Sequence, residues 1–470
     1  MILPRSTVTE EAWRHSIERL AGGSLTLLGL WGDPPNVHMA TFEETSGDIA
    51  VLSYVCRNGT YPSVSARHPP AGRLERAIRD LSGLDASGAP DTRPWIAHSA
   101  EPYAFLPSEG EGLHQIPVGP VHAGIIEPGH FRFTANGEHV VRLEQRLGYA
   151  HKGIEKLCAG ATLGAAAKLA ARTSGDSTVA YSLAFALAAE AALQIAPPPR
   201  AIYLRALMAE LERLANHFGD IGAICNDASF AMMHAQTGIL RERTLRAAAA
   251  CFGHRLMMDV IVPGGVTHDI AADGSAQLSA LLDEIRRVFP RLIDLYDNTA
   301  SLQDRTVGTG IVKAEYARQF GAGGFIGRAA GRAFDARRTP GYAPYDALGF
   351  DVPVLDAGDV NARVWIRIRE VEQSLSLIDQ ILTRLPAGEI RAVAAPAAAS
   401  GEGLALVEAF RGDVLIWLRL DSQGRVARLH LRDASWFQWP LLETAVQDNI
   451  VADFPLCNKS FNCSYSGHDL

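Results

Sequence analysis

The most chemically suggestive residues interrupt a long segment rich in Ala and Leu, where residues 171–178 read ARTSGDST. Ser and Asp side chains compete with a helix for backbone hydrogen bonds, so this stretch predicts a break in a core helix. The hydroxyls of Ser174 and Ser177 beside the carboxylate of Asp176 indicate a polar, hydrated pocket. Arg172 in apolar surroundings needs an acceptor, so we expect it to be buried and to pair with Asp176. Asp176 is alternatively a proton-relay group.

Helices must position these residues. Apolar spacing predicts a helix from Gly153 towards Ile195, broken by this stretch, and another that opens at the prolines of 197–199. Further helices are expected near residues 238–258, 275–301 and 362–385. Alternating apolar residues then predict three strands, at residues 404–410, 413–421 and 425–433. This part of the chain is therefore expected to be a helical bundle with peripheral β-structure.

The first hundred residues have a different pattern, in which predicted helices and strands are mixed. A helix is expected over Glu10–Leu20, with Thr9 or Ser6 as its cap, and strands from Ser24 and from Asp48. A Gly/Pro-rich connection separates these two strands, and a short helix follows near residues 72–81. The loop-like composition of residues 97–115 predicts a domain boundary. Beyond it, Asn-Gly at residues 136–137 predicts a β-hairpin.

Composition narrows the class of protein. The chain has 470 residues, 47% hydrophobic and 20% charged, which predicts two or more packed units with large cores. A net charge of −8 argues against a nucleic-acid-binding face, so no nucleic-acid partner is expected. The six cysteines are scattered without C-x-x-C pairs, so we expect buried free thiols.

No membrane span or secretory signal is expected. The most apolar stretch, residues 179–196, is interrupted by Glu190 and Gln194 and ends at prolines, so it predicts a buried helix. The N-terminus carries charges throughout and lacks the apolar core of a signal peptide. Any membrane association is therefore expected to come through partners.

Four stretches together carry a family resemblance: GPVHAGIIEPGHFRF from Gly119, RLGYAHKGIEKL from Arg146, ARTSGDST, and DFPLCNKSFNCSYSGHDL from Asp453. They resemble the large subunit of the membrane-bound nickel–iron hydrogenases of the formate hydrogenlyase and hydrogenase-4 type. The 49-kDa-type subunit of respiratory complex I is equally similar. This resemblance covers residues 116–470, whereas residues 1–100 resemble, more weakly, the complex I 30-kDa-type subunit. It implies an α+β fold: a helical-bundle core with peripheral β-structure, preceded by a small α/β domain.

The resemblance bears directly on nickel. The hydrogenases carry R-x-C-G-x-C at this break and D-P-C-x-x-C near the C-terminus, and the four thiolates hold nickel. Here the corresponding positions are Ser174, Ser177, Ser464 and Gly467. A hydroxyl is a hard, protonated donor and glycine has no ligand atom, so no nickel–iron centre is expected. Cys463 is one residue away and would face the opposite side of an extended segment.

The complex I resemblance implies a quinone cavity in place of the metal. His122 fits the first histidine of the G-P-x-H loop that contacts quinone in complex I. A hydrogen bond to the loop backbone is an equal alternative for this side chain. The second histidine aligns either with Ile126 or, across an insertion, with His130, for which a structural role is favoured. Both histidines are retained as cofactor-binding residues.

Two further quinone positions are partly matched. Asp227 lies near the aspartate that pairs with the loop histidine, although a helix cap or a surface acid is favoured for it. The complex I tyrosine position falls near Leu169, which cannot donate a proton. Tyr181 lies about two turns further along the same helix and is the remaining cavity candidate.

The resulting hypothesis is a non-metallated large subunit of a membrane-associated, energy-converting oxidoreductase complex. The resemblance implies peripheral attachment to the cytoplasmic face of the inner membrane. It implies as partners an iron–sulfur small subunit that carries the electron-donating cluster, and antiporter-like membrane subunits. Quinone would bind at the shared cavity, and no cofactor would belong to this chain alone. No G-x-G-x-x-G loop stands between a strand and a helix, so NAD(P)H would be oxidised elsewhere in such a complex. The alternatives are a purely structural assembly subunit and a hydrogenase with atypical ligands.

Overall fold

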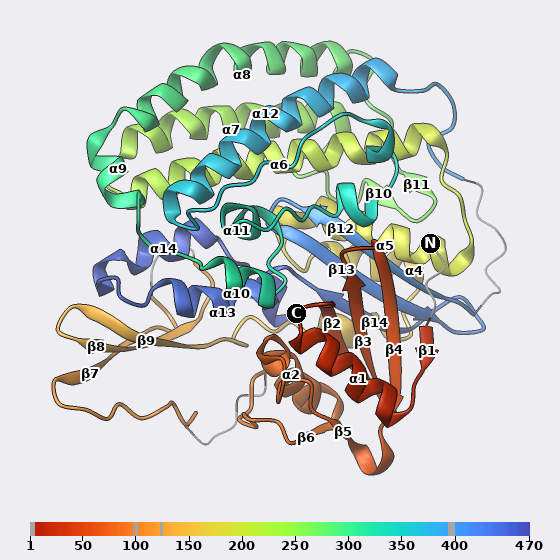
Figure 1. Cartoon of the computed structure of the whole chain (residues 1–470). Helices are drawn as coiled ribbons and strands as arrows, with labels where there is room; N and C mark the ends of the chain where they lie inside the picture. The colour runs from red at the N-terminus through yellow and green to blue at the C-terminus, as the bar shows by residue number, and fades with distance from the viewer. Residues whose placement is uncertain (1–4, 97, 99–101, 123–125, 393–399) are drawn as a thin grey trace.

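The N-terminal part of the chain is built on a mixed four-stranded sheet (Figure 1). The computed structural model describes residues 5–96, 98, 102–122, 126–392 and 400–470. The strands are β1 (Arg5–Thr7), β2 (Thr26–Asp33), β3 (Asn36–Glu43) and β4 (Asp48–Val55). Their order is β1-β4-β3-β2, with β1 parallel to β4 and the other pairs antiparallel. The two predicted strands are confirmed, and β3 occupies what the sequence analysis treated as a connection.

Two helices cover one face of this sheet. They are α1 (Glu10–Ala21) and α2 (Gly72–Ser82). Both predicted helices are confirmed, and the Thr9 hydroxyl caps α1 by accepting from the backbone N–H of Ala12. Short strands β5 (Thr60–Pro62) and β6 (Asp85–Ser87) pair in parallel beside them. The predicted domain end at residue 100 lies outside the described residues.

Long helices form the opposite side of the molecule, as the sequence analysis predicts (Figure 1). The bundle consists of α6 (Pro199–Asp227), α7 (Ala231–Phe252), α8 (Gly274–Asp297) and α12 (Val360–Arg384). The segment before α6 forms α3 (Ile154–Cys158), α4 (Leu163–Ala171) and α5 (Thr178–Leu193). Shorter elements complete this region: α9 (Ala300–Thr306), α10 (Ala314–Gln319), α11 (Gly324–Ala329), β10 (Ile261–Val262) and β11 (Gly265–Val266).

A second sheet joins the two sides. It contains the three predicted strands in antiparallel order, β12 (Glu402–Ala409), β13 (Gly412–Leu420) and β14 (Val426–Arg432). α5 lies directly on β12, so closely that a Cβ at Gly403 would stand 1.9 Å from the carbonyl oxygen of Ala188. Only glycine allows this approach. The contact explains why α5 is buried almost all round, as predicted for residues 179–196.

The other face of this second sheet packs on the N-terminal sheet. Alternate side chains of β2, β3 and β4 meet alternate side chains of β12 and β13 in one apolar cluster. Trp31 of β2 stacks on His430 of β14 with ring centroids 4.6 Å apart. The N-terminal part is therefore an integral layer of the molecule.

A third sheet lies on the side of the molecule away from the bundle, at the lower left of Figure 1. It consists of β7 (Leu113–Val118), β8 (His130–Asn136) and β9 (His139–Arg146). The antiparallel pair of β8 and β9 confirms the predicted hairpin, whose two-residue loop is Gly137-Glu138. The chain closes with α13 (Ser435–Ala445), α14 (Phe454–Phe461) and α15 (Tyr465–Asp469). These helices pack between the hairpin and the bundle, which brings the C-terminal motif into the interior.

The expectation about the cysteines is confirmed. All six cysteines are buried free thiols. Among the described residues, no helix has the length and apolar character that a bilayer crossing requires.

Candidate functional site

The predicted helix break is present, and three polar side chains come together at it. α4 and α5 are separated by a 3₁₀ turn at Gly175–Ser177, and Ser174 has extended backbone angles (φ −144°, ψ 124°). The hydroxyls of Ser174 and Ser177 both donate to Oδ1 of Asp176, at 2.6 and 3.3 Å. These bonds satisfy hydroxyls that are buried in the core of the molecule.

The C-terminal motif meets this turn. A left-handed residue, Asn462, ends α14 and redirects the chain. The Ser464 hydroxyl then donates to the Ser174 hydroxyl at 3.3 Å and accepts from the backbone N–H of Gly467 at 2.8 Å. Residues 290 positions apart are thus in contact, as the family resemblance implies.

These residues do not fit a nickel–iron centre. Three of the four former ligand positions supply neutral hydroxyls, and Gly467 supplies no side chain. A Cβ built at Gly467 would stand 2.9 Å from both Cγ of Asp433 and Oγ of Ser464, so a thiolate there would require rearrangement. Within the described ranges, no group of three or more His, Cys, Asp or Glu side chains could hold a metal ion.

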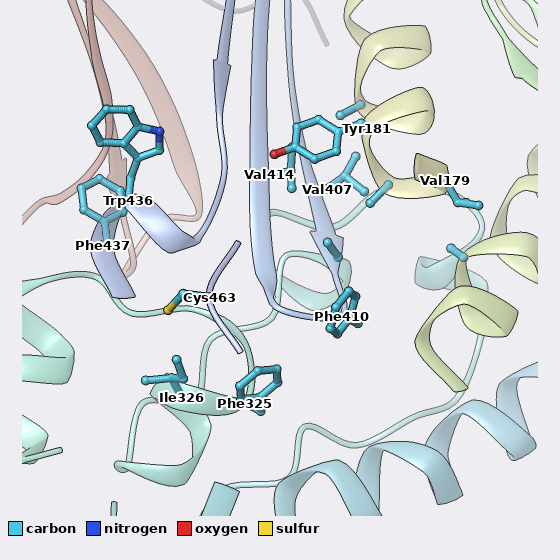
Figure 2. Close-up of a cluster of buried hydrophobic side chains, with 14 of the residues drawn as sticks. Val179, Tyr181, Phe325, Ile326, Val407, Phe410, Val414, Trp436, Phe437 and Cys463 are labelled. Atoms are coloured by element: carbon cyan, nitrogen blue, oxygen red, sulfur yellow. The ribbon is translucent and has the colours of Figure 1, made fainter. Parts of the chain in front are cut away.

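The neighbouring cysteines do not restore the site. Figure 2 shows Cys463 among Trp436, Phe437 and Ile326 in an apolar cluster. Its side chain is 6% exposed, and burial raises the pKa of its thiol well above the usual range. Burial likewise raises the pKa of Cys457 to about 12. Both behave as packed, protonated thiols.

An ion pair lies beside the two serines of this turn. Arg411 donates to both carboxylate oxygens of Asp176, at 2.6 and 2.8 Å, and its Nη1 also donates to the Ser177 hydroxyl at 3.2 Å. The Arg411 side chain is 5% exposed, whereas that of Asp176 is 36% exposed. Burial opposes ionisation of Asp176, but the charge and hydrogen bonds of Arg411 outweigh it and lower the carboxyl pKa to about 2. Asp176 is therefore ionised at neutral pH.

A tight hairpin presents Arg411. Ala409 pairs with Gly412, leaving Phe410 and Arg411 as a two-residue loop between β12 and β13. Gly412 has φ 135°, and a Cβ there would stand 2.9 Å from the backbone nitrogen of residue 324, so glycine is required. An arginine in a two-residue turn between apolar strands was the available signal. Sequence analysis missed it.

Buried arginine side chains hold the β12–β13 hairpin in place. Arg213 of α6 donates to the backbone carbonyls of Glu408 and Ala409, at 2.9 and 3.2 Å. Arg328 of α11 donates to the Glu408 carboxylate at 2.9 Å and pairs with Glu370 of α12. These bonds connect the hairpin to three helices, so the position of Arg411 is rigidly determined.

A cavity of about 750 Å³ opens next to the ion pair. It lies between residues of the ranges 118–122 and 126–131, the C-terminal half of α6, the N-terminal half of α7, the β12–β13 hairpin loop, and residues 454–465. Ser174, Asp176, Arg411 and Ser464 are among its lining residues. The volume is in the range of pockets that hold cofactor-sized ligands.

His122 and Tyr465 face this cavity from different elements. Both belong to its lining, and their ring centroids are 6.4 Å apart. Burial lowers the pKa of His122, so the neutral imidazole is favoured at neutral pH. Burial raises the pKa of Tyr465 and keeps the phenol protonated, although the nearby Asn458 amide acts on that pKa in the opposite direction. Sequence analysis missed Tyr465, although it directly follows the former ligand position Ser464.

Other predicted residues fall into different surroundings. Asp227 lines the same cavity from the end of α6, and burial raises its pKa. Nδ1 of His130 bonds the carbonyl of Gly119 at 3.1 Å, and Nε2 accepts from Arg132. His130 therefore ties the start of β8 to Gly119 and is not part of the cavity lining.

Tyr181 is behind the cavity. Its phenol is fully buried and donates to Oδ2 of Asp433 at 2.8 Å. Figure 2 shows the ring beside Val407 and Val414, between α5 and the second sheet. Burial raises the phenol pKa well above its usual value, with the Asp433 charge acting in the same direction. Tyr181 is therefore a core residue.

The expectations for Arg172 are wrong. Its side chain is 43% exposed and forms a bidentate pair with Asp259 at 2.6 and 2.8 Å, so it is neither buried nor paired with Asp176. The helix break lies between Arg172 and the pocket, and it turns this side chain to the surface while Arg411 reaches Asp176 instead.

Replacing Arg172 with alanine should therefore have a small effect. An exposed pair contributes at most about 1 kcal/mol, so we expect Arg172→Ala to lower the free energy of unfolding by less than about 1 kcal/mol. Urea denaturation of the two proteins measures this difference. A much larger loss would contradict the surface position.

Comparison with known proteins identifies similar chains. The family described as "Respiratory-chain NADH dehydrogenase, 49 Kd subunit" matches residues 227–399. Formate hydrogenlyase subunit 5 of Escherichia coli is 32% identical over 437 residues, covering 87% of this chain and 77% of that protein. The carbon monoxide-induced hydrogenase of Rhodospirillum rubrum is 30% identical, covering 74% of this chain and 97% of that protein.

Two further comparisons support the same grouping. An NADH-quinone oxidoreductase subunit of Roseiflexus sp. is 31% identical, over 72% of this chain and 94% of that protein. A chain of the membrane-bound sulfane sulfur reductase, an archaeal respiratory membrane complex, has the same fold. It superposes with a TM-score of 0.72 at 24% identity, covering 77% of this chain and 99% of that one.

Proposed function

This chain belongs to the family that unites the large subunits of formate hydrogenlyase-type hydrogenases with their counterpart in NADH-quinone oxidoreductase, and we propose that it is a member without a nickel–iron centre. The observation that carries the proposal is the Asp176–Arg411 pair, which lies beside Ser174 and Ser177 at two of the positions where the resemblance places ligand cysteines. A buried cation needs an anion close by, and here the Asp176 carboxylate supplies it while the four matching positions supply no thiolate.

Metal analysis tests this directly. The complex should be purified with its native partners, and nickel and iron counted per large subunit. We expect iron from partner clusters and nickel far below one atom per chain. The Escherichia coli formate hydrogenlyase, prepared in parallel, controls for nickel supply and loss. Stoichiometric nickel in this complex would overturn the proposal and favour a hydrogenase with atypical ligands.

We further propose that the cavity binds a quinone headgroup. Reduction takes two electrons and two protons, and an iron–sulfur small subunit would supply the electrons at the face of residues 118–122 and 126–131. Tyr465 and His122 both line this cavity, and the Tyr465 phenol would donate one proton to a carbonyl oxygen of the quinone. The neutral His122 imidazole would first take up a proton from water and then pass it to the other carbonyl oxygen, and the Tyr465 phenolate would be reprotonated from solvent. Asp176 and Arg411 hold a fixed dipole in the cavity lining, which would orient the polar headgroup.

The assembly around the chain follows from the same proposal. Relatives are subunits of hydrogenase and respiratory complexes, which supports membrane-associated partners and a peripheral position at the cytoplasmic face of the inner membrane. We also propose the division into a 30-kDa-like unit at residues 1–100 and a 49-kDa-like unit at residues 116–470. The separate N-terminal sheet supports this division.

A structural assembly subunit is the competing proposal. It requires no ligand in the cavity, so quinone should neither bind nor be reduced. Binding of a short-chain quinone to the purified complex, followed by turnover with its reduced clusters, separates the two proposals. Absence of both would favour the structural role.

A further inference from the structure

A second cavity, of about 390 Å³, lies where α2 meets β9 and α13. It shares no lining residue with the first cavity. Its charged lining residues are Arg73, Arg76, Arg93, Arg142, Asp91, Glu144 and Glu443. Neither the family resemblance nor the proposed quinone chemistry assigns a role to this position between the N-terminal layer and the rest of the molecule.

Two buried donors in this cavity lack acceptors. Nη2 of Arg73 donates to Gln145 Oε1 at 3.2 Å and to Glu443 Oε1 at 2.7 Å, but Nη1 has no partner within the described structure. The amide Nε2 of Gln145 is also buried without a partner among the described residues, and the whole residue is 1% exposed. Because an unpaired buried donor costs stability, adjacent ones indicate a missing acceptor.

The surrounding charges favour an anion as that acceptor. Four guanidinium groups face three carboxylates in the lining, and Asp91 and Glu144 are already engaged by Arg76 and Arg93. The guanidinium carbons of Arg73 and Arg76 lie 4.7 and 4.6 Å from the centre of the Trp95 ring, so two like charges share one aromatic ring. The cavity therefore has a surplus positive charge next to the free donors.

The direction of the pKa shift of Arg73 agrees with this surplus of positive charge. Burial lowers the pKa of Arg73, the Glu443 charge opposes the shift, and the nearby Arg76 charge adds to it. A bound anion would relieve both unfavourable effects.

We propose that this cavity binds a molecule carrying a phosphate group. Tetrahedral phosphate oxygens can accept from Arg73 Nη1 and Gln145 Nε2 at once, since these two side chains are already hydrogen-bonded to each other. The remaining volume holds the body of the molecule. Because the ligand would touch α2, β9 and α13 together, its binding would tighten the contact between the N-terminal layer and the rest of the chain.

The test uses the full-length chain and inorganic phosphate and pyrophosphate, titrated by calorimetry. The wild-type chain should bind, and its melting temperature should rise with ligand concentration. Gln145→Glu places a carboxylate beside Arg73, satisfies its free donor, and should weaken binding at least about tenfold, since it replaces attraction by repulsion. Gln423→Glu makes the same charge change in the exposed turn between β13 and β14, and should bind like wild type.

Two additions keep the proposal testable. Arg73→Met removes the donors but keeps the apolar stem on Trp95, and it should also lose binding. This second variant tests the proposal if Gln145→Glu does not fold. Flotation with phosphatidylglycerol vesicles distinguishes a lipid headgroup from a soluble ligand, since lipid binding would then also depend on Gln145. Absence of binding to phosphate, pyrophosphate and vesicles would overturn the proposal. So would binding that survives both Gln145→Glu and Arg73→Met.

Discussion

A chain in which Asp176 is replaced by alanine is expected to lose about 3–5 kcal/mol of its free energy of unfolding. The substitution leaves the guanidinium of Arg411, 5% exposed, without its anion in the core of the molecule. Two hydroxyls, those of Ser174 and Ser177, lose their acceptor at the same time. Urea denaturation followed by circular dichroism measures the loss.

Replacing the partner, Arg411, should lower the free energy of unfolding by less than replacing Asp176 does. This asymmetry makes the prediction specific. In Arg411→Met the remaining carboxylate is 36% exposed and can be hydrated from the cavity, so it avoids most of the desolvation penalty. The double variant should recover much of the loss of Asp176→Ala, because no unpaired charge remains. Equal losses in both single variants would contradict the asymmetric burial.

The same pair predicts a dependence on pH. The pKa of Asp176 is lowered from 3.8 to about 2 in the folded chain, so its contribution to stability is present above about pH 4. It is lost as the pH falls through 2, where the folded carboxylate is protonated. The difference in stability between wild type and Asp176→Ala should therefore be constant near neutrality and shrink below pH 4.

The second large effect concerns proton delivery to quinone. Tyr465→Phe is expected to lower the rate of quinone reduction by about 10²-fold or more, since it removes a positioned general acid from the cavity. The effect should be on kcat more than on KM, because the ring and its contact with Trp439 remain. Steady-state turnover of the purified complex with a short-chain quinone measures both constants.

Tyr181→Phe is the matched control. It removes the same hydroxyl from a buried tyrosine that donates to Asp433 behind the cavity. Leaving that carboxylate without its donor should cost about 1–3 kcal/mol of stability while turnover is preserved. If instead Tyr181→Phe abolishes turnover and Tyr465→Phe does not, the assignment of the proton donor is wrong.

The contacts around the β12–β13 hairpin loop link the α4–α5 turn to the C-terminal motif. These two segments are linked by Ser464 to Ser174, and by Arg411, whose Nε donates to the carbonyl of Asn462 at 2.5 Å while its Nη atoms bind Asp176. The Asp176–Arg411 pair therefore helps to hold these two segments together.

Local sequence was sufficient for several parts of this molecule. The break at residues 174–177, the hairpin at Asn136-Gly137, the proline-initiated α6 and the three C-terminal strands all follow from short-range preferences of Ser, Gly, Pro and alternating apolar residues. The absence of thiolates at the four former ligand positions is likewise a property of the sequence alone. Helix and turn signals act over a few residues, which is why they can be recognised without the fold.

Only the tertiary structure decided which side chains share a space. Arg172 is close to Ser174 in the sequence, yet it points to the surface, whereas Arg411 reaches Asp176 from 235 residues away. Tyr181 and Tyr465 are both plausible donors by type, and packing puts the first behind the cavity and the second on its lining. The side chain's direction after a helix break, and the partner brought to it by a distant hairpin, depend on long-range packing that no short stretch of sequence encodes.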